Sequence, residues 1–130
     1  MLATRNHFTS DEACRLAGVS YRQADYWVRL GLIEPMVQAT GSGSRRRFCL
    51  EDVVALRVVH LLMRHRLPQE TIREVLGSLG ADKPLIWIRD GRATSGDAFD
   101  FLGEADHLKG DEVVLVFSPA AMLEELHNRG

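Results

Sequence analysis

The chain has 130 residues, which is enough for one domain of ordinary size or for one small domain with an appendage. Hydrophobic residues make up 45% and charged residues 26%, a composition typical of a soluble globular protein and not of a disordered or fibrous chain. No apolar run approaches the roughly 18 residues that span a bilayer, and the first ten residues lack the apolar core of a secretory signal. The two cysteines, Cys14 and Cys49, are too few for a disulfide scaffold. We therefore expect a cytoplasmic protein, with neither secretion nor membrane insertion.

The charge is divided unevenly along the chain, although the net charge is only −2. Residues 1–80 carry 11 Arg and Lys against 8 Asp and Glu, whereas residues 81–130 carry 5 against 10. Fourteen of the 16 basic residues are arginine, whose planar guanidinium binds phosphate or guanine through two parallel hydrogen bonds. This asymmetry favours contact between the first part and a polyanion. The abundant Arg codons of a GC-rich genome explain the arginine content equally well.

Two short helices open the predicted fold. Thr9, with Glu12 three residues later, forms the capping box of a helix that ends at Ala17. Ser20 caps a second helix, which runs from Tyr21 to Leu30 and is stopped by a glycine. Two short helices joined by a tight turn that contains glycine form a helix-turn-helix.

A hairpin and two further helices follow. The loop 39–44 is rich in Gly and Ser and lies between two β-compatible runs, 36–38 and 46–48, which predicts a hairpin, or wing. The stretch 51–66 is dense in apolar residues and is predicted as a well-buried helix. Residues 69–79 form another helix, whose first turn tolerates the proline that precedes it.

The composition changes near residue 81, where we place a boundary. The predicted elements beyond it are a strand, a turn that leads into a short return strand, a helix, a strong buried strand and a final helix, at 85–88, Asp90-Gly91, 97–108, 113–117 and 119–127. A unit of this size rarely folds alone, so it should pack on the first part or on a second copy. The fold class is mainly α: a winged helix-turn-helix of four helices plus a β-hairpin wing at 8–80, then a small α/β unit at 81–130 for dimerisation or effector binding.

The first turn of the second helix carries side chains that can read bases. Arg22 can bind guanine O6 and N7, Gln23 can pair with adenine, and Tyr21 lies beside them. The capping residues Thr9 and Ser20, with the free amides at each helix start, can receive a backbone phosphate. The alternative is that these side chains are ordinary solvated helix surface.

Three consecutive arginines, Arg45, Arg46 and Arg47, follow the Gly/Ser loop. Nothing bulky in that loop prevents close approach to a phosphate backbone. Side chains alternate along a strand, so not all three can contact DNA equally, and one could instead pair with an acid of its own domain. A solvated charged surface is again the alternative.

The middle of the second helix carries an aromatic pair. We expect Trp27 to pack in the core, while the Tyr26 hydroxyl remains available to a phosphate. Arg29 is a further candidate phosphate contact.

Several short motifs occur in a characteristic order: Phe8-Thr9, Gly18-Val19-Ser20-Tyr21-Arg22, Tyr26-Trp27, Gly31-Leu32-Ile33, Gly43, Arg46-Arg47-Phe48 and Glu51-Asp52-Val53. With these, residues 8 to about 76 resemble the MerR-type winged helix-turn-helix regulators, and the short tail resembles an actinobacterial-like subgroup of them. The resemblance implies that Arg22, Tyr26 and Arg46 contact DNA, and it extends this role to Arg47. Asp25 stands where the family often has a basic residue, so one phosphate contact is missing or replaced.

We therefore expect a sequence-specific double-stranded-DNA-binding transcriptional regulator of a bacterial nucleoid, acting as a homodimer on a pseudo-palindromic site. RNA polymerase and an unidentified effector are further candidate partners, and the acidic tail, with its apolar strand 113–117, is the candidate dimerisation or effector element. We expect no cofactor, metal ion or catalytic residue, because Cys49, His60 and His65 match no ligand spacing and Cys14 suits a small buried thiol.

Two other functions fit the same sequence. One is an architectural or recombination-directionality DNA-binding protein, which would fill clustered sites cooperatively. The other is a protein-interaction adaptor or antitoxin whose tail binds a partner and whose helix-turn-helix is only a scaffold. The salt dependence of DNA affinity separates the last of these from the other two, because counterion release makes affinity fall steeply with salt.

Overall fold

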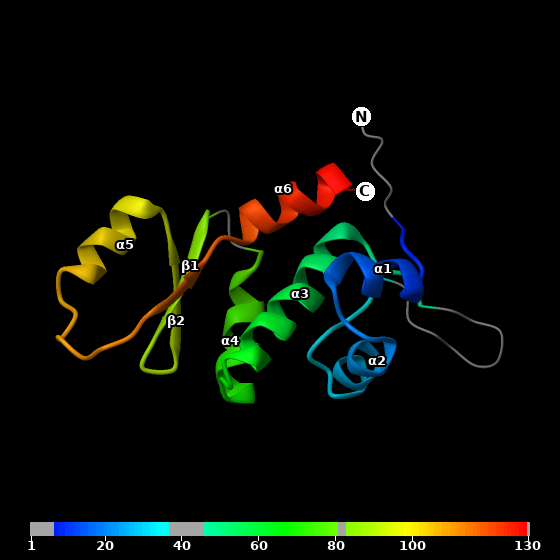
Figure 1. Ribbon diagram of the computed structural model, residues 1–130, viewed down its shortest axis with the longest axis horizontal. Helices are drawn as coiled ribbons and strands as arrows, with labels where there is room; N and C mark the ends of the chain where they lie inside the picture. The colour runs from blue at the N-terminus through cyan, green and yellow to red at the C-terminus, as the bar shows by residue number, and fades with distance from the viewer. Residues whose placement is uncertain (1–6, 37–45, 81–82, 130) are drawn as a thin grey trace.

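The computed structural model describes residues 7–36, 46–80 and 83–129, which form six helices and three strands (Figure 1). In chain order they are α1 Ser10–Ala17, α2 Tyr21–Arg29, α3 Leu50–Arg64, α4 Gln69–Ser78, β1 Leu85–Arg89, β2 Arg92–Gly96, α5 Ala98–Ala105, β3 Leu115–Phe117 and α6 Pro119–Arg129. The fold is mainly helical, as predicted, with an α/β part at the C-terminal end. We call residues 7–80 the N-terminal unit and residues 83–129 the C-terminal unit.

Local sequence signals fix the start of α1 and of α2. The Thr9 hydroxyl accepts from the Glu12 N–H at 3.2 Å, and the Glu12 carboxylate accepts from the Thr9 N–H at 2.9 Å. Ser20 and Gln23 form the same reciprocal pair, with both bonds at 3.0 Å. Gly31 follows α2 with a φ of 78°, a left-handed conformation that glycine adopts without strain. Both predicted capping boxes and the glycine stop are confirmed.

The predicted wing lies mostly outside the described residues. Its loop, 39–44, and most of its first strand belong to that part of the chain. At the base of the wing, Phe48 and Phe8 form an antiparallel bridge with N···O distances of 2.7 and 2.9 Å. Both phenylalanines are buried, so the bridge joins the end of the wing, at Phe48, to the segment just before α1, at Phe8.

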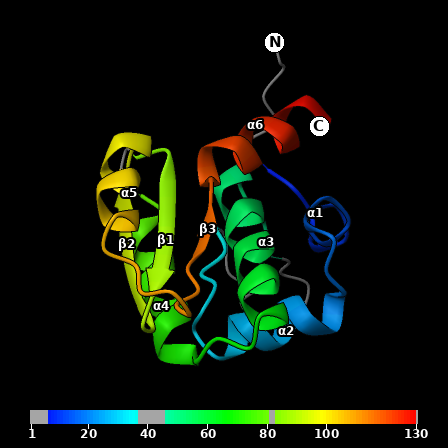
Figure 2. The ribbon, with the colours of Figure 1, turned by 60° about the vertical axis from the view of Figure 1, so that its left-hand side comes forward.

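Helix α3 runs through the middle of the molecule (Figures 1 and 2). It has six buried residues, among them Val53, Leu56 and Leu62. Helices α1, α4 and α6 all pack against it. The prediction of a well-buried helix in this region is confirmed; the helix ends at Arg64 and Arg66 adopts a φ of 58°.

The sheet is antiparallel, with strand order β2-β1-β3. Asp90 and Gly91, with φ of 52° and 73°, form the predicted two-residue turn between β1 and β2. Ile86 and Ile88 point to one face and join the main core cluster. On the other face Trp87 packs edge-on against Phe101 of α5, with ring centroids 5.2 Å apart. Figure 2 shows α5 on this outer face.

The C-terminal unit packs on the N-terminal unit. Helix α6 lies against α3, where Leu126 is buried in the shared core. Strand β2 is held by α4, since the Thr71 hydroxyl donates to the Gly91 carbonyl at 2.8 Å and the Glu74 carboxylate accepts from the Ala93 N–H at 2.7 Å. The sequence left open whether the C-terminal unit packs on the first part of the chain or on a second copy, and in this structure it packs on the first part.

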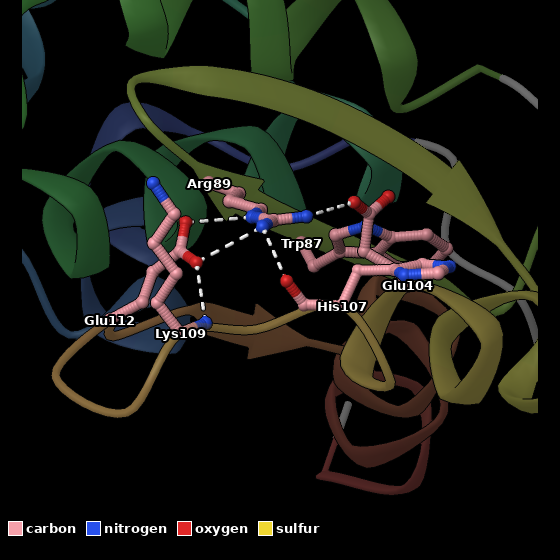
Figure 3. A network of polar contacts seen from close by, with 6 residues as sticks. All are labelled: Trp87, Arg89, Glu104, His107, Lys109 and Glu112. Atoms are coloured by element: carbon pink, nitrogen blue, oxygen red, sulfur yellow. Dashed lines mark hydrogen bonds and ion pairs between the residues drawn. The ribbon is translucent and has the colours of Figure 1, made fainter.

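A network of charged groups joins β1, α5 and the loop before β3 (Figure 3). The Arg89 guanidinium binds Glu112 at 2.7 and 3.0 Å, Glu104 at 2.7 Å and the His107 carbonyl at 3.1 Å. The Arg89 guanidinium and then the Lys109 N–H lower the pKa of Glu112 to about 2. Arg89, followed by the Trp87 indole, lowers the pKa of Glu104 as well.

Two predictions for the C-terminal unit are corrected. The strand expected over 113–117 is shorter and less buried, because β3 pairs with β1 alone and its ladder covers Leu115 to Phe117 only; Val113 is 86% exposed. The helix expected over 97–108 begins after its cap Asp97 and ends at Ala105. The chain then turns, and this turn brings the His107 carbonyl to Arg89.

Candidate nucleic-acid interface

One face of α2 carries exposed side chains, and the opposite face is buried. Arg22, Tyr26 and Arg29 lie at positions i, i+4 and i+7, which share a side of a helix. All three are exposed, whereas Ala24 and Trp27 are buried on the opposite side. The expected core position of Trp27 and the exposed position of Tyr26, at 56%, are confirmed.

At the start of α2, the side chains of Arg22 and Tyr21 are exposed and are not used as helix caps. Tyr21 is 57% exposed, and within the described part of the chain Arg22 makes no hydrogen bond or ion pair. A long guanidinium side chain at the N-terminal turn of a helix has the reach to contact base edges in a major groove.

The other polar side chains at this end are engaged as helix caps. The Oε1 atom of Gln23 accepts from the Ser20 N–H, and the Ser20 hydroxyl accepts from the Gln23 N–H. Thr9 has the same role at α1. A two-point contact between Gln23 and adenine needs both atoms of its amide, so it would break the capping box of α2.

Asp25 holds two of the arginines that were expected to contact DNA. Its Oδ2 lies 3.0 Å from Nε of Arg29, one helical turn later, and its Oδ1 lies 2.7 Å from Nη1 of Arg46, at the base of the wing. The Arg29 side chain is still 75% exposed, but that of Arg46 is only 16% exposed. Asp25 thus ties the wing base to the exposed face of α2.

Arg46 is therefore the wing arginine that pairs with an acid of its own domain. Its Nε is buried and has no partner in the described structure. Arg47 is half-buried, and its Nη1 donates to the Arg46 carbonyl at 3.3 Å. Arg45 lies outside the described residues.

The sequence analysis named Asp25 as a departure from the family pattern but did not identify its partners. The Asp25–Arg29 pair is visible in the sequence, because an acid four residues before an arginine is a stabilising helix pair. The Asp25–Arg46 pair joins residues 21 positions apart, across the wing, and no local signal indicates it.

Neither cysteine has the environment of a reactive thiol. Burial raises the pKa of Cys14, and burial is also the largest cause that raises the pKa of Cys49 to about 11. Both thiols thus stay protonated near neutral pH, whereas metal binding needs the thiolate. In the ranges that the structure describes, no three His, Cys, Asp or Glu side chains gather as metal ligands would, and no helix has the length and apolarity to cross a membrane.

The comparisons with known proteins agree with this geometry. Residues 8–79, more than half of the chain, match the family described as "MerR HTH family regulatory protein". The chain belongs to the MerR HTH family. The match extends from the Phe8 bridge through the exposed face of α2 to the end of α4, so the whole candidate interface lies inside this MerR-family region.

Curated relatives carry regulator names. Proteins of Mycobacterium tuberculosis (strain H37Rv) and Mycobacterium bovis, each named an uncharacterized HTH-type transcriptional regulator, are 36% identical to this MerR-family chain over 73 residues. The alignment covers 55% of this chain and 32% of each relative. The aligned part thus spans about a third of the length of these relatives.

Proposed function

We propose that this chain is a sequence-specific double-stranded-DNA-binding transcriptional regulator of a bacterial nucleoid, acting as a homodimer. The observation that carries the proposal is the face of α2 formed by Arg22, Tyr26 and Arg29, exposed on one side of a helix-turn-helix of the MerR family. Helix α2 enters the major groove with its N-terminal turn foremost.

The base-reading residue in this proposal is Arg22. A free guanidinium fits guanine O6 and N7 through two parallel hydrogen bonds, and such a contact discriminates against a wrong base by about 1–3 kcal/mol. Tyr21, Tyr26 and Arg29 then contact the backbone beside it. Thr9, Ser20 and Gln23 contribute mainly by capping α1 and α2, with their helix amides directed towards phosphates.

Arg46 acts through Asp25 in this proposal. The partly buried ion pair holds the wing base against α2, and in this proposal Arg47 and Arg45 contact DNA from the wing. A double-mutant cycle tests this role. Asp25→Ala, Arg46→Ala and the double variant should lose the same affinity for DNA. If Arg46 binds DNA directly, Asp25→Ala will leave affinity unchanged or raise it, while Arg46→Ala alone will lower it.

Dimerisation is supported by the C-terminal unit, which exposes several large apolar side chains: Phe99, Leu102, Val113 and Val116. Exposed apolar patches commonly mark interaction sites. One module makes few base contacts, whereas two modules on a pseudo-palindrome multiply discrimination. RNA polymerase and an effector are the further partners of this proposal.

The decisive experiment first selects bound sites from random double-stranded DNA, then measures affinity by fluorescence anisotropy. We expect a pseudo-palindromic motif, a steep decrease in affinity with salt, and a loss of about 5- to 150-fold for Arg22→Ala, the equivalent of 1–3 kcal/mol. Arg92→Ala is the matched control, because Arg92 is an exposed arginine of β2 in the C-terminal unit.

Other outcomes would overturn the proposal in distinct ways. Flat salt dependence and equal affinity for Arg22→Ala and the wild type would favour a protein-interaction adaptor. Clustered sites filled cooperatively, without any effect on a nearby promoter, would favour an architectural or recombination-directionality protein.

A further inference from the structure

A second basic site lies away from the exposed face of α2, in a pocket between α1, α3 and α6. The pocket has a volume of about 260 Å³. Its basic side chains are Arg57, His60 and Arg64 of α3, and its other walls include Gly18 at the end of α1 and Met122 of α6. Among the described residues that line it, none is acidic.

The three basic side chains gather because of their spacing. Positions 57, 60 and 64 are i, i+3 and i+7, which lie along one side of a helix. The two arginines thus lie two helical turns apart, on either side of His60. Arg57 is partly buried here, so water screens its charge less completely than it would on an open surface.

The pocket supplies cationic donors and leaves them unused. Across the described ranges, neither arginine nor His60 makes a hydrogen bond or an ion pair. The carboxyl end of α1, at Ala17 and Gly18, provides only the fractional negative charge of a helix terminus. Arg89 differs from these two arginines, because its guanidinium forms ion pairs with Glu104 and Glu112.

We propose that this pocket binds an oxyanion, a phosphate or carboxylate group, through Arg57, Arg64 and His60. Two guanidinium groups offer paired donors to such a group, and Leu61 and Met122 provide an apolar wall for a small organic part. The site extends the proposed function but does not depend on it. The pocket reaches Gly18, two residues before the cap of α2, and also reaches Met122 of α6, so a ligand bound there lies between the helix-turn-helix and the C-terminal unit.

The oxyanion has two sources: a free small molecule or a phosphate of the DNA backbone. The test uses the full chain and inorganic phosphate, with chloride at matched ionic strength as the reference. A ligand that binds the folded state raises the unfolding temperature with concentration. We expect phosphate to raise the Tm of the wild type and of Arg92→Gln, and to raise that of the Arg57→Gln/Arg64→Gln double variant much less.

A DNA-binding measurement without phosphate separates the two sources. If the anion is a free ligand, the double variant binds DNA as the wild type does. If it is a backbone phosphate, the double variant loses affinity uniformly across sequences, and its salt slope falls by about 2. The Tm measurement and the NMR titration described below contain no DNA. Phosphate binding can therefore be tested even if the proposed DNA-binding function is wrong.

A direct readout on the wild type covers the case in which the double variant does not fold. Titration with phosphate should shift the NMR signals of the His60 imidazole and of the Gly18 amide, in a saturable way that chloride does not reproduce. The proposal is overturned if phosphate and chloride give the same Tm and the same shifts. It is also overturned if the folded double variant responds to phosphate as the wild type does.

Discussion

The two units of the molecule are stabilised in different ways. In the N-terminal unit, α3 alone has six buried residues and packs against α1 and α4. In the C-terminal unit, α5 has none. It is attached to the sheet by the Trp87–Phe101 contact and by the Arg89 network (Figure 3). A unit too small to build its own core thus relies on charged groups for its outer layer and on its neighbour for its inner layer.

The largest effect is expected from a cavity in the core that the two units share, which tests whether the units unfold together. Leu62→Ala removes a fully buried side chain of α3 and should cost about 2–5 kcal/mol in the free energy of unfolding. Each unit has one buried tryptophan, Trp27 or Trp87, so Trp87→Phe and Trp27→Phe backgrounds report on the units separately. Ile86 and Leu126 share the core with α3. We therefore expect urea denaturation, followed by the fluorescence of either tryptophan, to show the same loss of unfolding free energy.

The control for the Leu62→Ala experiment is Ile86→Ala, which creates a cavity beside β1 of the C-terminal unit. If the two units unfold together, as the shared core indicates, Ile86→Ala also lowers the urea midpoint reported by Trp27 in the N-terminal unit. Two separate midpoints, with Trp27 unaffected by Ile86→Ala, would show that the C-terminal unit unfolds by itself.

The charged network gives a smaller effect, which depends on pH. The pKa of Glu112 is about 2 in the fold and 4.5 ordinarily, so the folded state favours its ionised form. This contribution is complete above about pH 4.5 and is lost as the pH falls towards 2. Glu112→Gln should therefore lower the Tm at pH 6, and the difference from the wild type should shrink at pH 3.

Glu125→Gln is the matched control for Glu112→Gln, because Glu125 is an exposed glutamate of α6. It should leave the Tm unchanged at both pH values. A Glu112→Gln variant whose deficit is the same at pH 6 and pH 3 would contradict the role assigned to the ion pair with Arg89.

The smallest effect is expected on the outer surface of α5. Phe99 is 84% exposed in the single chain, so at protein concentrations low enough to keep the chain monomeric Phe99→Ser should change the free energy of unfolding by no more than about 0.5 kcal/mol. Phe101→Ser, two residues away, removes the ring that packs on Trp87 and should cost more. Urea denaturation at a fixed protein concentration compares the two. Equal losses would mean that the exposed ring of Phe99 is buried in an assembly of chains.

The sequence predicted the features that depend on neighbouring residues. The capping boxes of Thr9 and Ser20 and the Asp90-Gly91 turn each involve residues at most three positions apart, so their chemistry is visible in a short window. The burial of Trp27 was predicted from the aromatic pair that it forms with Tyr26. The family pattern added the order of the elements.

The features that were missed depend on distant parts of the chain. Asp25 and Arg46 are 21 positions apart, and Arg89 and Glu112 are 23 apart. The length of β3 depends on how far β1 extends beside it, which the apolar run 113–117 does not encode. Such pairings arise only when the fold brings separate elements together.

The path of the chain has a consequence for how the protein can be divided. After the sheet, the chain returns so that Leu126, in the last helix, fills a space beside α3. A fragment that stops at residue 80 contains every helix of the family region, yet it leaves that side of α3 open to water. Such a fragment would be expected to self-associate or to need a substitute for α6, so the helix-turn-helix and the helix that covers this side of its core come from distant parts of the sequence.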